Sequence, residues 1–163
     1  MKNAFTTRPH HKRNRRKRAG QLHFDMDELG EIFDFFKHLL IVKVEHDEQG
    51  AKLQFKSGEH IHIADDEVRI SRHPSDDLIK ASAELTKARW GGEVAYGPGS
   101  EELKIRYWAY DTAAGNRVTN YTPQGASKLK AEQLLAQIRA EQAAPHPATF
   151  APPRPAAPAP RPS

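Results

Sequence analysis

The sequence predicts a single small α+β domain with a mainly antiparallel sheet and three to four helices. In some segments apolar residues recur at helical spacing, in others they alternate with polar residues, and large apolar residues are nearly missing from both ends. We therefore divide the 163 residues into a disordered basic arm over 1–20, a globular part over 21–143 and a disordered, Pro/Ala-rich tail over 144–163.

The globular part is expected to begin with an amphipathic helix over 26–39, in which apolar residues repeat at intervals of three and four. From 41 to 71, apolar residues alternate with polar ones and are interrupted by turn-forming segments. This pattern predicts four antiparallel strands with an outward face of Lys, Gln, His and Arg.

Two serines mark the starts of further helices, because a serine hydroxyl can accept a hydrogen bond from the free backbone N–H groups of a first turn. Ser75 begins a helix that ends at Gly91 and Gly92, and Ser100 begins one that ends near Gly115. We expect short strands at 94–96 and 117–119 and a last helix over about 126–143.

Charge separates the arm from the globular part. Residues 1–20 carry eight Lys or Arg and no acid, whereas residues 21–143 hold all 21 acids against 15 bases, a net charge of −6. Apart from Met1, Phe5 is the single large apolar side chain in the arm. We therefore expect the arm to bury too little surface to offset the entropy lost on ordering.

Composition excludes several classes of protein. The chain has no cysteine, so disulfides, thiolate metal sites and cysteine nucleophiles are impossible. It shows neither a secretory leader nor an apolar run long enough to span a bilayer, and we expect a cytoplasmic protein without a membrane partner. No serine lies in a nucleophile motif, so we expect a non-catalytic protein without a cofactor.

The basic arm is the strongest functional signal. Clustered Lys and Arg neutralise phosphates and release condensed counterions whatever the base sequence, and the planar guanidinium pairs well with phosphate. We therefore expect the partner to be nucleic acid, with DNA as the first candidate, and we expect the protein to bind it without sequence preference. The residues expected to contact it are Arg8, Lys12, Arg13, Arg15, Arg16, Lys17 and Arg18.

Two weaker patterns have simpler interpretations. Gly99, Ser100 and Lys104 could hold a phosphate at a helix N-terminus, but two acids follow Ser100, and a capped helix start is favoured. His60 and His62 share one face of a strand and are candidate metal ligands. A metal site needs three or four converging donors, so a solvated strand face is favoured.

Four segments carry a resemblance to a known family: SGEHIHIADDEVRI, KARWGG, GPGSEELK and AAGNRVTNYTP. Together, over 56–123, they resemble the type-seven large polyvalent-protein-associated domain, found in relaxases and other proteins of conjugative plasmids and mobile elements. The resemblance implies a role in DNA transfer and association with DNA-processing proteins, but no catalytic residue. No relaxase domain precedes the module here, so nicking is expected to belong to a partner.

Together these observations predict a non-catalytic accessory protein of conjugative transfer or another mobile element. It would bind nucleic acid through the arm and a relaxase or similar DNA-processing protein through the folded part. Two alternatives stay open: a protein-interaction adaptor without nucleic-acid binding, and a metal-dependent enzyme that uses the His-rich face of the sheet.

Overall fold

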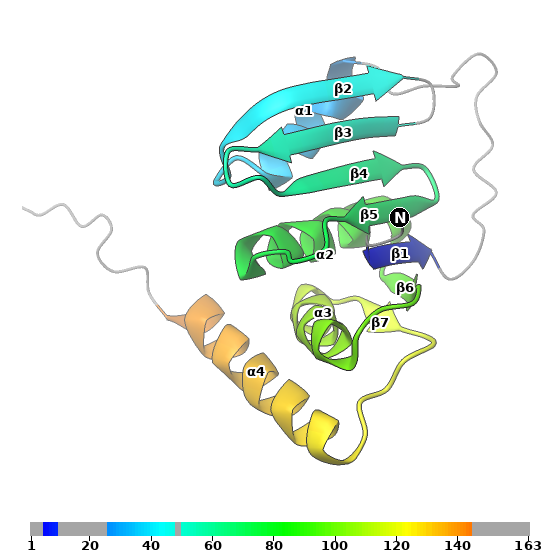
Figure 1. The fold of residues 1–163 in the computed structure, drawn as a ribbon. Helices are drawn as coiled ribbons and strands as arrows, with labels where there is room; N and C mark the ends of the chain where they lie inside the picture. Colours follow the sequence, from blue (N-terminus) through cyan, green and yellow to red (C-terminus); the bar gives the residue numbers. More distant parts are fainter. Residues whose placement is uncertain (1–4, 10–25, 48–49, 145–163) are drawn as a thin grey trace, which may run out of the picture.

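The computed structural model describes residues 5–9, 26–47 and 50–144. Its seven strands form one sheet in the order β2-β3-β4-β5-β1-β6-β7 (Figure 1). Neighbouring strands are antiparallel except β6 and β7, which confirms the predicted α+β class. The elements are β1 (Phe5–Pro9), α1 (Met26–Phe35), β2 (Ile41–Asp47), β3 (Gly50–Phe55), β4 (His60–Ala64), β5 (Glu67–Ile70), α2 (Asp76–Trp90), β6 (Glu93–Tyr96), α3 (Glu101–Ala114), β7 (Arg117–Val118) and α4 (Gly125–Ala143).

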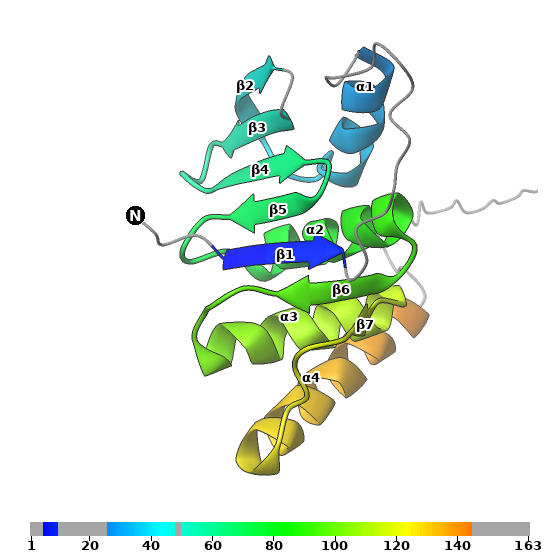
Figure 2. The ribbon, with the colours of Figure 1, turned by 90° about the vertical axis from the view of Figure 1, so that its right-hand side faces the viewer.

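Strand β1 lies inside the sheet, between β5 and β6 (Figure 2). Phe5 is 2% exposed, and its ring centroid is 4.5 Å from that of Tyr107. The prediction that residues 1–20 form an arm outside the domain is therefore wrong for residues 5–9. A short strand with neighbours on both sides has its backbone hydrogen bonds satisfied, and here it buries only Phe5 and Thr7. Residues 10–20 and 145–163 lie outside the described residues.

The four strands expected between 41 and 71 are confirmed as β2 to β5. Helix α1 is shorter than expected, because tight turns replace helical bonding after Phe35: Phe36 N–H donates to Phe33 at 3.0 Å and Leu39 N–H to Phe36 at 2.9 Å. Phe36 is nevertheless fully buried, so the apolar stripe that predicted a longer helix still contacts the core.

The predicted ends of the next two helices are confirmed. Ser75 and Ser100 accept hydrogen bonds from backbone N–H groups in the first turns of α2 and α3, at 3.2 and 3.1 Å. Gly91 and Gly115 end these helices with φ of 84° and 95°, in the left-handed region that glycine adopts without strain. The last helix, α4, agrees with the expected range to within one residue at its start.

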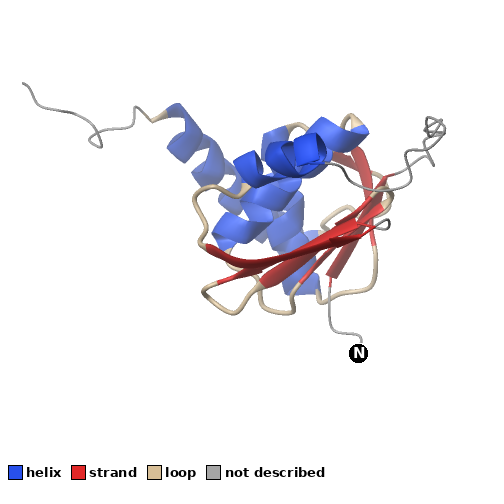
Figure 3. Ribbon diagram, turned by 90° about the horizontal axis from the view of Figure 1, so that it is seen from above, coloured by secondary structure: helices blue, strands red, loops and turns tan. Residues whose placement is uncertain are grey.

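Helices α1, α2 and α3 lie on one side of the sheet, and α4 packs outside α3 (Figure 3). The main core lies between the sheet and this helical layer, while a smaller cluster joins α4 to α3 through Ala109, Leu135 and Ile138. None of the described helices covers the other side of the sheet. We call that side the open face.

Candidate nucleic-acid interface

The structure places one residue of the predicted nucleic-acid-binding set within a strand. Arg8 lies in β1, its side chain is 62% exposed, and its Nη2 is 2.9 Å from Glu67 Oε1. The other six predicted residues lie outside the described residues, between Pro9 and Met26: Lys12, Arg13, Arg15, Arg16, Lys17 and Arg18. The chain therefore connects this basic cluster to the folded domain on both sides, through β1 and through α1.

The open face carries most of the charged side chains of the sheet. Along β1, β3, β4, β5 and β6 the buried residues alternate with exposed or half-buried ones, so apolar side chains contact the helices and polar ones project from the other side. The Lys and Arg residues of the open face are Arg8, Lys43, Lys52, Arg69 and Arg117, its acids are Glu45, Asp47, Glu67 and Glu93, and its histidines are His60 and His62. Cations outnumber acids here, although the globular part as a whole is acidic.

The acid at the centre of the open face lies beneath two cations. Glu67 accepts from Arg8 through one carboxylate oxygen and from Arg69 through the other. The side chain of Glu67 is only 15% exposed, compared with 62% for Arg8 and 57% for Arg69. The two guanidinium groups thus face solvent above one shared carboxylate, and the surface they present is positive.

A row of polar side chains crosses the middle of the sheet. Lys52 on β3 is directly opposite His62 on β4, which is directly opposite Arg69 on β5. Neighbouring strands are about 4.8 Å apart, so the row places two cations and an imidazole within about 10 Å. In the next row His60 has a lowered pKa, because burial and then the charge of Lys52 disfavour its protonated form.

His60 and His62 lie on the same face of β4, as the sequence predicted. Within the described ranges, no group of three or more His, Asp or Glu residues is arranged to hold a metal ion. What these imidazoles offer at the open face is hydrogen bonding next to Lys52 and Arg69.

The predicted phosphate site is only partly assembled. Gly99 and Ser100 line a cavity of about 610 Å³, whereas Lys104 lies 5.8 Å from the centroid of the Tyr121 ring. A Cβ on Gly99 would lie 2.6 Å from the Phe5 ring, so packing against β1 is sufficient to explain the glycine. The cavity also has Arg72, His73, Glu102 and Arg106 in its wall, with Phe5, Pro74, Pro98 and Leu103.

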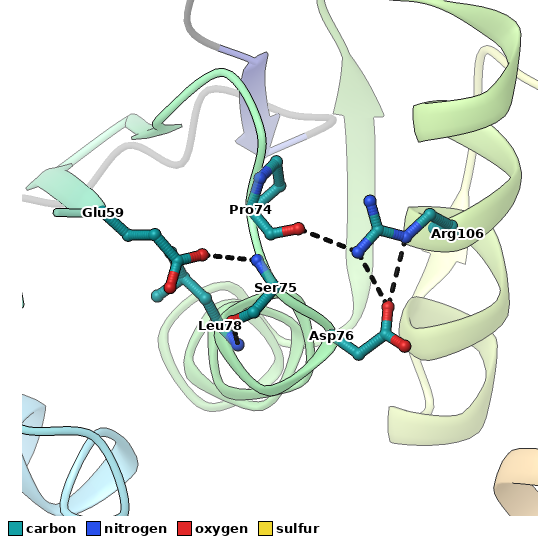
Figure 4. Close-up of polar contacts among 6 residues, drawn as sticks. All are labelled: Glu59, Pro74, Ser75, Asp76, Leu78 and Arg106. Carbon is teal, nitrogen blue, oxygen red and sulfur yellow. Dashed lines mark hydrogen bonds and ion pairs between the residues drawn. The ribbon is translucent and has the colours of Figure 1, made fainter. Parts of the chain in front are cut away.

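Arg106 is already engaged within the protein (Figure 4). Its guanidinium donates twice to Asp76, at 2.8 and 3.1 Å, and once to the carbonyl of Pro74, at 2.8 Å. On the other side of the same turn, Glu59 accepts from the backbone N–H of Ser75 (Figure 4). These contacts attach α3 and the turn between β3 and β4 to the start of α2, so we interpret Arg106 as structural.

Residues of the motif AAGNRVTNYTP also stabilise the fold. Asp111, 1% exposed, accepts from the hydroxyl of Tyr96 at 2.5 Å and from the amide of Asn116 at 2.9 Å. Burial raises the pKa of Asp111 to about 6, and the two hydrogen bonds oppose that shift. Asn120 accepts from the backbone N–H of Tyr96 and donates to its carbonyl, both at 2.8 Å, as a strand residue would.

The aromatic residues of the second half pack mainly inward. The indole N–H of Trp90 donates to the carbonyl of Asp65 at 3.0 Å, and Tyr107 is fully buried. Tyr121 stacks near Tyr96 with centroids 6.1 Å apart and donates to Glu101 at 2.7 Å. The structural roles of Asp111, Asn116 and Asn120 were not predicted from the sequence. The signal that could have indicated them is the presence of an acid and two amides in otherwise apolar segments.

Comparisons with protein-family models, with curated proteins and with solved structures find no significant match to this chain. The resemblance to the polyvalent-protein-associated domain therefore stays a prediction. In the part of the chain that the structure describes, no helix combines the length and the apolar character that a bilayer span requires.

Proposed function

We propose that the protein binds nucleic acid through its phosphate backbone, as a non-catalytic accessory of conjugative DNA transfer or of another mobile element. The observation that carries the proposal is the density of positive charge between β1 and α1. Six of the seven residues from Lys12 to Arg18 are Lys or Arg, and the adjacent strand adds Arg8. Such a cluster binds phosphates without reading bases.

Attachment at both ends favours this role. Because β1 and α1 belong to the folded domain, the basic cluster is joined to that domain at both of its ends in the sequence. A segment held at both ends also has less conformational entropy to lose on binding than a free terminus. The mobile-element context itself rests on the four sequence motifs that resemble the polyvalent-protein-associated domain.

A relaxase-like protein is the second proposed partner, and β2 is the surface that favours it. Strand β2 is at the edge of the sheet, paired with β3 alone among the described strands. Leu40, Val42 and Val44 at this edge are large apolar residues exposed to solvent. An unpaired strand edge with exposed apolar side chains is suited to accept an extended segment of another protein.

Neutralising part of the basic cluster tests the nucleic-acid role. The variant with Arg13, Arg15, Arg16 and Arg18 changed to Gln should bind a duplex at low salt at least about tenfold more weakly than the wild-type chain. The slope of log affinity against log salt should fall by roughly 3 to 4, because each phosphate that the protein neutralises contributes about 0.9. Fluorescence anisotropy with a labelled duplex measures both quantities. Deleting residues 1–20 would be unsuitable because it removes β1.

The matched control removes the same charge from helices α2 and α4, through Gln at the exposed positions Lys80, Lys128, Lys130 and Arg139. Equal affinities for the two variants would contradict the proposed role of the cluster. For the second partner, a purified relaxase from the same element should bind the wild-type chain and not Val42→Asp, and equal binding of both would contradict docking on β2.

A further inference from the structure

We propose that the open face of the sheet is a second contact surface for nucleic acid, and that it takes the phosphate backbone of a duplex. The inference rests on the proposed nucleic-acid role and assigns to it a site within the folded domain. The contact residues are in the centre of the sheet: Lys52 on β3, His62 on β4, and Arg69 on β5, with Arg8 on the adjacent strand β1.

Charge complementarity is the first argument. The five Lys and Arg of the open face exceed its four acids, and Glu67 and Glu93 are the less exposed members of the two cross-strand ion pairs. The side chains of Arg8 and Arg117 are 62% and 70% exposed, those of their partners Glu67 and Glu93 15% and 42%. At these two pairs, a polyanion that approaches the open face meets guanidinium groups before it meets carboxylates.

The side chains of the open face favour the backbone of a duplex over a single strand or a protein as the partner. Its described strand residues include no aromatic side chain, so it offers bases no stacking platform of the kind that binds single strands. Between Lys52 and Arg8 it also lacks the large apolar residues that form the centre of a protein–protein interface. Lys, Arg and His with Thr6 and Gln54 are suited to hydrogen bonding with phosphate oxygens.

Position supports the same assignment. Arg8 belongs to the open face and lies one residue before the end of β1. A duplex bound along the row from Lys52 to Arg69 therefore lies beside the strand that leads to the basic cluster. Both sets of cations can then neutralise phosphates of one duplex, which increases the number of counterions released.

Substitution of two open-face cations in the full chain tests this site. We expect Lys52→Gln with Arg69→Gln to weaken binding of a labelled duplex DNA about tenfold at low salt. The salt slope should become less steep by about 2, one unit for each phosphate that is no longer neutralised. The matched control, Lys80→Gln with Lys130→Gln, removes the same charge from α2 and α4. Both variants lose two positive charges, and the long-range effect of that loss is common to them. Beyond this shared effect, the control should change neither the affinity for duplex DNA nor the salt slope.

The outcomes separate this inference from the proposed function. The open-face site alone is overturned if the open-face pair and its control have equal affinities and only the variant of Arg13, Arg15, Arg16 and Arg18 binds more weakly. In that case an acidic protein is the remaining partner for the open face. A wild-type chain that binds no duplex at low salt overturns both proposals.

Duplex DNA, duplex RNA and single-stranded DNA are measured in parallel. Tighter binding of a single strand than of either duplex contradicts the assignment to duplex backbone. Tighter binding of duplex RNA than of duplex DNA supports the open-face site and identifies duplex RNA as its ligand. Thermal unfolding of each variant, with midpoints equal to the wild type, excludes loss of fold as the cause of a weaker affinity.

Discussion

The two faces of the sheet are built from the same strands but have different roles. In β1, Phe5 and Thr7 are buried beneath the helices, whereas Arg8 projects from the open face. In β5, Val68 and Ile70 are buried and Arg69 is exposed. Alternation along a strand thus allows one short segment to stabilise the core on one side and to present cations on the other.

The comparison also shows why net charge is a poor guide to the surface of this protein. The residues from 21 to 143 have a net charge of −6, but four of the acids lie in the ten residues of α1, on the covered side. The open face, by contrast, has more Lys and Arg than Asp and Glu in its strand interiors. A polyanion responds to the local arrangement rather than to the total.

The largest expected effect comes from truncating the covered side of β1. Phe5→Ala should lower the free energy of unfolding by about 3–5 kcal/mol, because Phe5 fills space against Tyr96 and Tyr107. Thr6→Ala, one residue along on the open face, should lower it by less than about 1 kcal/mol. Urea unfolding followed by circular dichroism measures both values.

The pair Phe5→Ala and Thr6→Ala is informative because the two residues share one strand and one local backbone. If the variants are equally stable, or if Phe5→Ala unfolds at the wild-type urea concentration, β1 does not contribute to the core and the distinction between the two faces is lost.

A somewhat smaller effect is expected from the buried carboxyl of Asp111, on the covered side. Its pKa is about 6 in the folded protein, compared with an ordinary value of 3.8, so the folded state holds the proton more tightly. The contribution of Asp111 to stability is thus greatest below about pH 4 and is lost as the pH rises through 6. The loss is up to about 3 kcal/mol, at 1.36 kcal/mol for each pKa unit.

Asp111→Asn removes the titration, because asparagine cannot ionise, and its one carbonyl oxygen can replace one of the two acceptors that Tyr96 and Asn116 use. Unfolding of both proteins between pH 4 and pH 7 should show the variant gaining up to about 3 kcal/mol relative to the wild type. Parallel pH profiles for the two proteins would mean that Asp111 does not titrate as its buried position implies.

Much of the fold follows from local sequence patterns. The four strands from 41 to 71 can be predicted because alternation between apolar and polar residues is a local property, and the cap at Ser75 because its hydroxyl bonds its own first turn. The outward orientation of His60 and His62 follows in the same way. Each of these features needs no information about distant residues.

Features that depend on distant partners could not be predicted in this way. Strand β1 is five residues long in a basic segment, and its burial depends on β5 and β6, which lie about 60 and 90 residues further along the chain. Likewise, Arg8 could be identified as a cation from the sequence, but not as one that shares Glu67 with Arg69. The structural role of Asn116 depends on Ala83 and Asp111 in different helices.

Mapping a bound duplex by NMR on the isotope-labelled full chain tests the central claim most directly. We predict that amide signals of β3, β4, β5 and β1 shift on addition of duplex, centred on Lys52, His62 and Arg69, while those of α2 and α3 on the covered side stay in place. Shifts confined to the helical side, with the open face unchanged, would contradict it.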